Sequence, residues 1–568
     1  MGLDRNTITA IVLALVILLG WEFVIAPRVM PKPAVTKDKT EASLPATPPS
    51  MTAPGETPTP AEKTGAPEKR IRISTPSLDG SLTLTGGRID DITLVKYRET
   101  LDPKSPEITL LSPTVSAKPY YSELGWITND SSIAVPSPTT EWTAENPDGG
   151  LTETTPVVLT WNNGQGLTFK RAISIDRDYL FTIIQTVENT GEKPVTLYPY
   201  ALIARLDGLG HSTTYLLHEG PMGVFNKASK DIKYDALKKA GREQIESTGG
   251  WIGITDKYWL AAVAFDQSLK VTGSFNHTMS GERDRYQTDL RTDGITIAPG
   301  ESKDVKSYLF AGAKELQTLD HYADNVGIDR LDLAIDFGWF FYLTKPFFLG
   351  LRWLYGKIGN FGIAILVFST FVRLLMFPIA NRQYATMNAM KKLQPEMKKL
   401  QERHAGGDRQ KMNAELMELY KREKVNPLAG CLPILIQIPV FFALYKVLFI
   451  AIEMRHAPFY GWIHDLSAAD PTGILTLFGL LPWTVPAFLV FFNIGAWPLI
   501  YGVTMFMQQR LSPQAGDPTT QKMMMYMPLI FTFVLASMPA GLVIYWTWSN
   551  LLGILQQWIL LKRAGIKV

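Results

Sequence analysis

One arginine stands inside a strongly apolar part of the sequence, and its charge is the clearest source of chemistry in the chain. Arg373 lies in the run 358–377, among leucine, valine, isoleucine and phenylalanine. A guanidinium within a bilayer is costly unless it is hydrated or paired, and such residues usually serve a function. Ser369 lies one helical turn earlier and would share its face. The pair could attract acidic groups inside a membrane, unless Arg373 simply extends to headgroups near Pro378.

Two further side chains could meet Arg373 in the same environment. Gln437 lies between two prolines of a later apolar segment, and Trp546 lies in the last one. Glutamines in such segments can join transmembrane helices by hydrogen bonds. Gln508, Asn550 and Gln556 are further polar residues of the apolar segments.

The sequence offers little for nucleotide, metal or redox chemistry. It contains no GxxxxGK[ST] phosphate loop, no GxGxxG turn and no HExxH pair, so a nucleotide-driven machine is not expected. Cys431 is the single cysteine, which excludes a disulfide framework and a cysteine-rich metal site. We therefore expect no enzymatic activity, no catalytic residues, no metal and no cofactor.

The composition divides the 568 residues into apolar ends and a polar middle. Residues 1–30 and 331–568 are strongly apolar, whereas 31–330 have the composition of a soluble protein. The formal net charge of +3 says little about partners, because the distribution of the charges matters more. At this length at least two folding units are expected.

The N-terminal segment predicts a membrane anchor followed by a tether. The run from Ile8 to Ala26 would be about 28 Å long as a helix, enough for a hydrocarbon core of roughly 30 Å. We expect 1–29 to stay uncleaved, because Pro27 would follow the only plausible signal-peptidase site. Residues 30–70 are rich in proline, threonine and alanine and should form a semi-extended spacer.

The polar middle, 71–327, predicts an all-β sandwich. Stretches such as Ile71-Arg-Ile-Ser and Lys170-Arg-Ala-Ile-Ser-Ile alternate apolar and polar residues, as half-buried strands do. Turn signals such as Asp79-Gly80 separate many short strands, and no helical rhythm lies between them. Catalysis by this domain is not expected, because histidines such as His211, His218 and His277 are scattered.

The C-terminal part predicts one surface helix and five membrane spans. Residues 328–352 mix Asp332, Asp336 and Lys345 with many aromatic residues, which favours a helix lying on the bilayer. The five-span core occupies 353–568. Its spans are expected at 358–377, 428–450, 488–507, 523–538 and 541–561.

The distribution of charge sets the topology of this part. Between Arg382 and Lys424 there are eleven Lys/Arg against six Asp/Glu, so this loop should face the cytoplasm. Residues 451–472 carry Arg455 alone against three acidic residues and should face outward. Arg510 and Lys522 flank the next short loop, and Lys562, Arg563 and Lys567 end the chain, so both should face the cytoplasm. Only an odd number of crossings between 472 and 510 satisfies this pattern, so 473–487 should form a re-entrant or interfacial apolar hairpin. With the anchor this gives six spans and two cytoplasmic termini.

The basic loop, 380–425, predicts a hairpin of two helices. The turn between them would lie at 404–408. Four lysines recur at a spacing of seven and would share one face, namely Lys391, Lys392, Lys398 and Lys399. That face could meet ribosomal RNA or anionic lipid, or could simply be solvated.

Specific motifs occur in order along the C-terminal part, and they carry a resemblance to a known family. They are Val372-Arg-Leu-Leu-Met-Phe-Pro, Leu393-Gln-Pro, Lys424-Val-Asn-Pro-Leu-Ala-Gly-Cys-Leu-Pro, Trp462-Ile-His-Asp-Leu-Ser and Gly541-Leu-Val-Ile-Tyr-Trp. On these motifs the chain resembles the YidC/Oxa/Alb family of membrane protein insertases over about 330–565. The anchor, tether and outer β domain match the Gram-negative arrangement in layout.

The resemblance implies a polytopic α-helical inner-membrane protein with six spans and a large periplasmic β-sandwich similar to galactose mutarotases. It implies that Arg373 lines a hydrophilic groove, open to the cytoplasm and the lipid and closed outward, where Ser369, Gln437 and Trp546 should meet it. Weaker candidates for the same groove are Gln508, Asn550 and Gln556. The groove would help hydrophobic segments of newly made proteins insert, fold and assemble, alone or with a Sec-type translocon. Nascent membrane proteins and lipids would be the partners, with a translocon and a ribosome as further candidates and no DNA.

Two features depart from the family pattern, and two other functions remain open. The apolar insert 473–487 is longer than in common members, and the tail lacks the basic extension that some members use to hold ribosomes. A transporter or channel is the alternative, but it should show ionisable residues in several spans or a repeated half, and mainly Arg373 and Lys446 are present. A membrane-anchored sugar-binding or epimerising protein would leave the matched motifs without a role.

Overall fold

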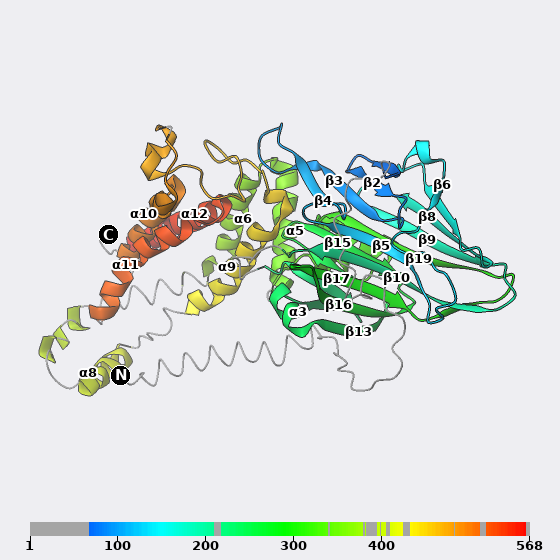
Figure 1. The fold of residues 1–568 in the computed structure, drawn as a ribbon. Coiled ribbons are helices and arrows are strands. Elements are labelled where there is room, and N and C mark those ends of the chain that lie inside the picture. Colours follow the sequence, from blue (N-terminus) through cyan, green and yellow to red (C-terminus); the bar gives the residue numbers. More distant parts are fainter. Residues whose placement is uncertain are drawn as a thin grey trace. The chain divides into compact units, whose positions relative to one another are not determined.

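The computed structural model separates into two compact units, one ending at Asp336 and the other beginning at Phe337 (Figure 1). The structure describes residues 68–208, 217–338, 341–378, 381, 393, 395–397, 399–400, 402–404, 409–423, 432–481, 483–511 and 518–563. The predicted anchor and nearly all of the predicted tether lie outside these residues.

The first unit is built from two antiparallel sheets (Figure 1). In spatial order, the main path of the first sheet is β1 (Arg70–Ser74), β2 (Leu78–Thr83), β3 (Ile89–Arg98), β5 (Tyr120–Ile127), β10 (Val195–Leu206), β17 (Arg283–Thr292), β16 (Lys270–Ser280) and β13 (Arg242–Thr248). Two short strands extend it, β4 (Glu107–Leu111) beside β3 and β18 (Ile295–Ile297) beside β10.

The second sheet lies in the same unit. Its spatial order is β12 (Ala228–Asp231), β11 (Gly220–Phe225), β14 (Trp251–Thr255), β15 (Trp259–Phe265), β19 (Ser302–Ala313), β9 (Leu180–Asn189), β8 (Leu167–Ile175), β7 (Val157–Asn162) and β6 (Thr143–Glu145). Short helices and turns complete the unit, namely η3 (Pro147–Gly149), α3 (Tyr234–Ala240), α4 (Leu316–His321), η4 (Tyr322–Val326) and η5 (Leu331–Ala334).

The alternation of residue types fixes which side chains enter the core of this unit. In β8 the alternate residues from Leu167 to Ile175 are buried and the residues between them are more exposed. Phe225 of β11 and Phe275 of β16 meet edge to face with ring centroids 6.0 Å apart, so the two sheets pack against each other. The predicted β-rich domain with two sheets is confirmed.

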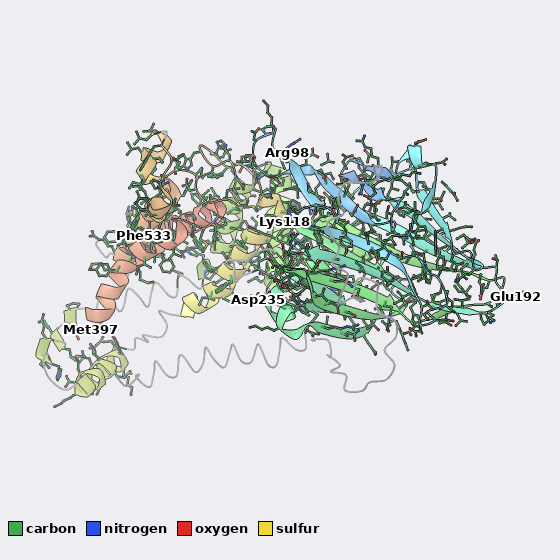
Figure 2. The ribbon with its side chains drawn as sticks, viewed as in Figure 1. Arg98, Lys118, Glu192, Asp235, Met397 and Phe533 are labelled. Atoms are coloured by element: carbon green, nitrogen blue, oxygen red, sulfur yellow. The ribbon has the colours of Figure 1, made fainter. Side chains whose placement is uncertain are left out.

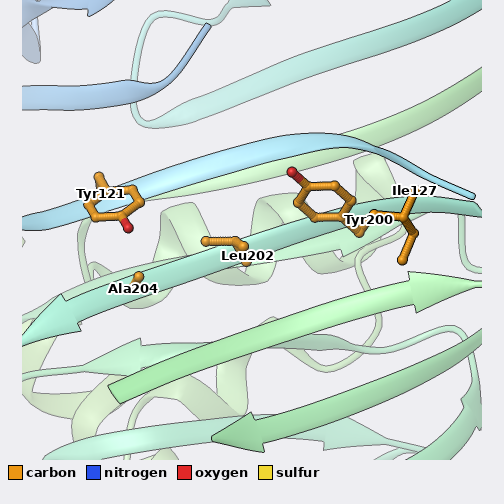
Figure 3. Close-up of a cluster of buried hydrophobic side chains, with 5 residues drawn as sticks. All are labelled: Tyr121, Ile127, Tyr200, Leu202 and Ala204. Carbon is orange, nitrogen blue, oxygen red and sulfur yellow. The ribbon is translucent and has the colours of Figure 1, made fainter. Parts of the chain in front are cut away.

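The first sheet also buries side chains on its other face. Figure 3 shows Tyr121 and Ile127 of β5 beside Tyr200, Leu202 and Ala204 of β10, all of them buried. The register pairs Tyr121 with Ala204, which places the five side chains on one side of the sheet. Both faces of the sheet are therefore shielded in its middle.

The second unit is helical. Its helices are α5 (Phe341–Ile358), α6 (Phe361–Leu375), α8 (Arg409–Arg422), α9 (Leu432–Ile450), α10 (Ala496–Leu511), α11 (Pro518–Leu535) and α12 (Ala540–Arg563). Among the described residues, short 3-10 segments lie between these helices, namely η7 (Ile452–Met454), η8 (Ile474–Gly479) and η9 (Ala487–Phe492). Helix α12 contacts α6, α9 and α10, helix α5 contacts α6 and α9, and helix α11 contacts α10.

Local sequence sets the ends of the key helices. The side chain of Asn360 accepts a hydrogen bond of 3.0 Å from the backbone of Ile363 and so caps α6. Helix α6 ends three residues before Pro378, which cannot continue it without losing a hydrogen bond. Helix α12 begins directly after Pro539 and ends on Lys562 and Arg563, which suit the negative end of the helix dipole.

The predicted surface helix over 328–352 is displaced in the structure. Leu331, Ala334 and Ile335 are buried in the first unit, and Asp332 pairs with Arg330 there. The amphipathic pattern favours a helix here, but the packing of these side chains into the core of the first unit determines the backbone conformation instead. The helix α5 starts at Phe341 and extends to Ile358.

Helices lie near each of the five predicted span positions, but their lengths differ. Among the described residues, one stretch, Phe488–Leu511, is by itself long and apolar enough to cross a membrane. It contains η9, a break, and α10, so the helix proper starts eight residues later than the predicted span. Shorter apolar helices are Phe361–Leu375, Ile438–Ile450 and Met525–Leu535.

Hydroxyl groups within these helices bond to their own backbone. Ser369 donates to the carbonyl of Ile365 at 2.7 Å, and Thr547 donates to that of Val543 at 2.8 Å. Thr370 and Thr532 do the same with the carbonyls four residues before them. A hydroxyl that is satisfied in this way carries little cost in an apolar environment.

Candidate functional site

Arg373 lies where helices α6, α10 and α12 meet. A Cβ built on Gly553 of α12 would lie 2.5 Å from Nη2 of Arg373 and 3.0 Å from Nε2 of Gln508, which belongs to α10. The guanidinium and the amide therefore share the space that the missing side chain of Gly553 leaves. We call Arg373, Gln508 and Gly553, together with Gln556 one turn after Gly553 on α12, the polar seam.

Two hydrogen bonds between helices hold the polar seam in place. Trp548 of α12 donates its indole N–H to Oγ1 of Thr370 on α6 at 3.0 Å. Asn550 of α12 donates to Oγ1 of Thr504 on α10 at 3.3 Å. Between apolar helices such bonds fix the relative rotation, because lipid offers no competing partners.

Several polar atoms of this region have no hydrogen-bond partner within the part of the chain that the structure describes. They include Nε of Arg373, both amide atoms of Gln556 and the indole nitrogen of Trp546, and all of them are buried. Unsatisfied buried groups are costly and rare. The region is therefore suited to bind water or the polar groups of another molecule.

The charge of Arg373 is not balanced by the surrounding helices. The sequences of α6, α9, α10, α11 and α12 contain no Asp or Glu. Lys446 of α9 and Arg510 of α10 add further positive charge. An acidic group entering between these helices would therefore meet cations and no competing carboxylate.

The structure places Trp546 in an aromatic cluster on the same helix. Its ring stacks on Phe441 of α9, with centroids 5.0 Å apart and planes at 6°, and tilts against Tyr501 of α10 at 6.2 Å. Trp546 lies two helical turns before Gly553. It belongs to the surroundings of the polar seam, and nothing shows it in contact with Arg373.

The structure places the other predicted groove residues in different surroundings. Ser369 is buried and bonds to its own helix, so its hydroxyl is not directed at Arg373. Gln437 lies in α9 one turn before Phe441, but its side chain lies outside the described residues. Among the weaker candidates, Gln508 shares the space beside Gly553 with Arg373, Gln556 lies one turn after Gly553 on α12, and Asn550 bonds to Thr504.

Gly553 is a site residue that the sequence reasoning missed. A glycine has no chemical group of its own, so a search for polar residues passes over it. The available signal was a small residue in a helix of large ones, between Leu552 and Ile554. Such positions often allow close approach between membrane helices.

The basic loop forms two packed helical segments where the structure describes it. Leu393 and Met397 are buried against Leu419 of α8. Glu396 pairs with Arg422 at 3.0 Å, which joins the same two segments. Lys399 is exposed, and Lys391, Lys392 and Lys398 lie outside the described residues.

The histidines of the β unit do not form one site. His277 of β16 lies 2.8 Å from the carboxylate of Asp284, and His218 contacts the backbone carbonyl of Pro221. Hydrogen bonds from Lys238 and His277 lower the pKa of Asp284. His211 lies outside the described residues. His321 of α4 lies 2.9 Å from the side-chain nitrogen of Asn325, so the three described histidines of this unit have separate local partners.

Two family models together match most of the chain. One is described as the YidC periplasmic domain and matches residues 70–349, and the other is described as the 60Kd inner membrane protein and matches 353–566. The chain is 46% identical to the membrane protein insertase YidC of Methylobacterium radiotolerans, over 100% of this chain and 96% of that protein. It is 49% identical to the protein of the same name from Brucella suis, over 92% and 86%.

Solved structures resemble the chain at lower identity. A crystal structure of an active YidC insertase aligns with 95% of this chain and 98% of that chain, with 18% identity and a TM-score of 0.36. A galactose mutarotase related enzyme from Lactobacillus acidophilus aligns with 43% of this chain and 97% of its own, with 8% identity and a TM-score of 0.30.

Proposed function

The chain belongs to the YidC family of membrane protein insertases, and from this premise we propose how its polar seam acts on a substrate. The protein helps hydrophobic segments of newly made membrane proteins to enter and fold in the inner membrane. The family assignment supports this function over that of a transporter or channel. Catalytic turnover, a metal and a cofactor have no role in the proposal.

The observation that carries the proposal is the unbalanced charge of Arg373 beside the glycine gap of α12. A hydrophobic segment gains free energy by entering lipid, but its polar flank must cross first. The guanidinium and the unsatisfied amide of Gln556 would give an acidic flank a transient site between α6, α10 and α12. The barrier to crossing falls because the flank exchanges water for charge-assisted hydrogen bonds.

The direction of movement follows from partitioning and from the membrane potential. A potential that is positive outside favours outward movement of each negative charge by about 2.3 kcal/mol per 100 mV. The hydrophobic segment then leaves sideways into lipid, where it is most stable. Nucleotide hydrolysis is not needed for either step.

We propose the following topology for the whole chain. Residues 1–29 form an anchor, 30–70 a tether and 71–327 the periplasmic domain, with α5 at the membrane surface. The core, 353–568, supplies five more spans, so the chain crosses the inner membrane six times with both termini in the cytoplasm. The excess of Lys and Arg in the basic loop 380–425 supports a cytoplasmic position for that loop.

We propose nascent membrane proteins and lipids as the partners of the core. The exposed Lys399, with the neighbouring lysines of the sequence, supports contact of the basic loop with a ribosome or anionic lipid. A Sec-type translocon is a further proposed partner. Nothing in the sequence suggests that the chain binds DNA.

Site-specific photocrosslinking during synthesis of a small membrane protein tests the proposal. A photoreactive residue at Gln508 leaves Arg373 in place and should crosslink the nascent chain, as should one at Gln437. The matched control is Val367, which is exposed on α6 and lies away from Arg373 around the helix. Equal substrate crosslinking from Val367 and Gln508 would contradict a site in the polar seam.

A further inference from the structure

A second apolar surface lies before α10 and has no part in the polar seam. We call residues 473–481 and 483–494 the apolar hairpin. Ten of its large apolar side chains are exposed, and two of them, Leu480 and Phe488, are 82% and 78% exposed. The others are Ile474, Leu477, Phe478, Leu481, Trp483, Val490, Phe491 and Phe492. A patch of this kind rarely faces water in a stable protein.

The apolar hairpin satisfies much of its own backbone. Ile474 donates to the carbonyl of Ile494 at 3.0 Å, and the indole N–H of Trp483 donates to the carbonyl of Leu475 at 2.8 Å. Phe478 donates to the carbonyl of Gly473 at 2.7 Å. Irregular backbone is tolerated in lipid only when its polar groups find partners inside the protein.

The base of the apolar hairpin is held by polar contacts. The carboxylate of Asp470 accepts hydrogen bonds from the backbone of Trp497 and from the side chains of Trp462 and Thr472. From Pro471 to Gln509 the sequence carries no charged residue. The apolar hairpin therefore carries no charged side chain beyond its base.

The apolar hairpin also reaches the neighbouring helix α11. Phe491 stacks on Phe533 of α11, with centroids 5.5 Å apart and planes at 15°, and Phe492 meets the same ring edge to face. Figure 2 labels Phe533 on this helix. The apolar hairpin is thus attached to α10 by the chain and to α11 by aromatic packing.

Two apolar residues at the tip have left-handed backbone conformations. Leu477 has a φ of 47° and Phe478 a φ of 57°, which non-glycine residues adopt only at a cost in free energy. Both side chains are more than four-tenths exposed as a result. A strained backbone that exposes apolar groups is stabilised only if those groups find an apolar environment.

We propose that the apolar hairpin inserts its exposed side chains among the acyl chains of the outer leaflet and anchors the outer ends of α10 and α11. The exposed face of α10, with Ile500, Val503 and Met507 at helical spacing, continues the same apolar surface. A protein partner is disfavoured, because the surface lacks the charged and polar rim that protein interfaces carry. The assignment to the outer leaflet rests on the proposed topology.

Fluorescence quenching in proteoliposomes of the full chain tests this proposal. With Cys431 replaced by alanine, single cysteines at Leu480, Thr484 and Phe488 are labelled with an environment-sensitive dye. Thr484→Cys is nearly isosteric and leaves the apolar side chains of the tip in place. It therefore keeps the test possible if the other two variants fail to fold. Val503→Cys on α10 is the lipid control, and Val115→Cys, 83% exposed in the β unit, is the water control.

The expected result is quenching by doxyl-labelled phosphatidylcholine comparable to that at Val503, with protection from iodide. Quenching by iodide as at Val115, without quenching by the lipid, would overturn the proposal. A photoreactive group at Thr484 that crosslinks a second copy of the chain or a nascent protein would also overturn it. Substrate insertion by the cysteine-free parent is measured in the same vesicles, and its absence with unchanged quenching counts against the insertase proposal alone.

Discussion

The guanidinium of Arg373 occupies the space that a side chain at Gly553 would fill. A Cβ on Gly553 would lie 2.5 Å from Nη2, well inside the normal contact distance. The position of the charge therefore depends on the absence of a methyl group on a different helix. A substitution at Gly553 can therefore change the position of the guanidinium without removing it.

We expect Gly553→Ala to lower insertion severalfold while leaving the helix intact. Alanine favours a helix over glycine by about 1 kcal/mol, so a loss of activity would come from the displaced guanidinium. The control is Gly356→Ala in α5, where a Cβ meets nothing within 4 Å. Insertion rates at matched protein levels measure the effect, and unchanged rates for Gly553→Ala would refute it.

Arg373→Ala should impair substrates in proportion to the acidic charge of their translocated tails. An interaction of about 1.4 kcal/mol per aspartate corresponds to a tenfold loss for each one. Arg373→Lys should retain much activity, because the ammonium keeps the charge although it lacks the planar fork. The measurement is insertion of one small substrate with zero, one or two aspartates in its tail.

Arg373→Gln is the control for that series, because it keeps polarity and reach but removes the charge. It should behave like Arg373→Ala on acidic tails. An equal loss for all three substrates would show that Arg373 acts through packing or anchoring. Extension of the guanidinium to headgroups would produce that uniform pattern.

The β unit should fold without the helical unit. Its two sheets bury a continuous core, and the division between the units falls after Asp336. A purified fragment 68–336 should therefore show a β-type circular dichroism spectrum and a cooperative thermal transition. We expect no aldose turnover, and anomer interconversion that is lost in His277→Ala would refute that expectation.

Asp289 should make the stability of this unit depend on pH. Burial raises its pKa to about 6 from 3.8, against the opposing effect of a hydrogen bond from Gln287 and the charges of Arg242 and Arg291. Because the folded pKa exceeds the unfolded one, the contribution is fully present below pH 3.8 and is lost as pH rises through 6. The loss is on the order of 3 kcal/mol.

The variant Asp289→Asn resembles the protonated acid and should remove this dependence. At pH 7.5 it should be more stable than the parent fragment by roughly 2 kcal/mol, measured by urea unfolding. The control is Asp130→Asn, because hydrogen bonds from Ser132 lower the pKa of Asp130. A gain for Asp130→Asn as large as that for Asp289→Asn would point to a general charge effect.

Thiol labelling should establish the proposed topology. In a background without Cys431, a cysteine at Asp465 should react with an impermeant reagent added outside, and one at Gln410 should not. In the proposed topology Asp465, which follows α9, lies outside, and Gln410, which lies in α8 of the basic loop, lies inside. Outside labelling of Gln410 would overturn the six-span topology.

The sequence predicted regular elements well where one period dominates. Strand β8 lies where the alternation from Lys170 placed it, and α6 lies within the predicted run 358–377. The predicted start of the surface helix at residue 328 was wrong, because Leu331 and Ile335 are buried in the β unit and pack into its core. Periodicity describes one element at a time, whereas the boundary between units depends on contacts distant in sequence.

The site was less predictable than the fold. Arg373 could be recognised from its own type, but the role of Gly553 depends on where α12 crosses α6. Ser369 shares a helix with Arg373, yet its hydroxyl prefers the carbonyl of Ile365, a bond that residue spacing does not reveal. Whether Ser369 and Gln437 line the groove stays a prediction.

The hydroxyls of Ser369, Thr370, Thr532 and Thr547 are all paired within their own helices. Each of these helices can therefore enter lipid alone without waiting for a neighbour to satisfy those groups. Arg373 and Gln556 differ, because their buried atoms gain nothing from their own helix. During the biogenesis of this chain, Arg373 and Gln556 therefore favour association of α6 with α12, as the hydrogen bond from Trp548 to Thr370 does.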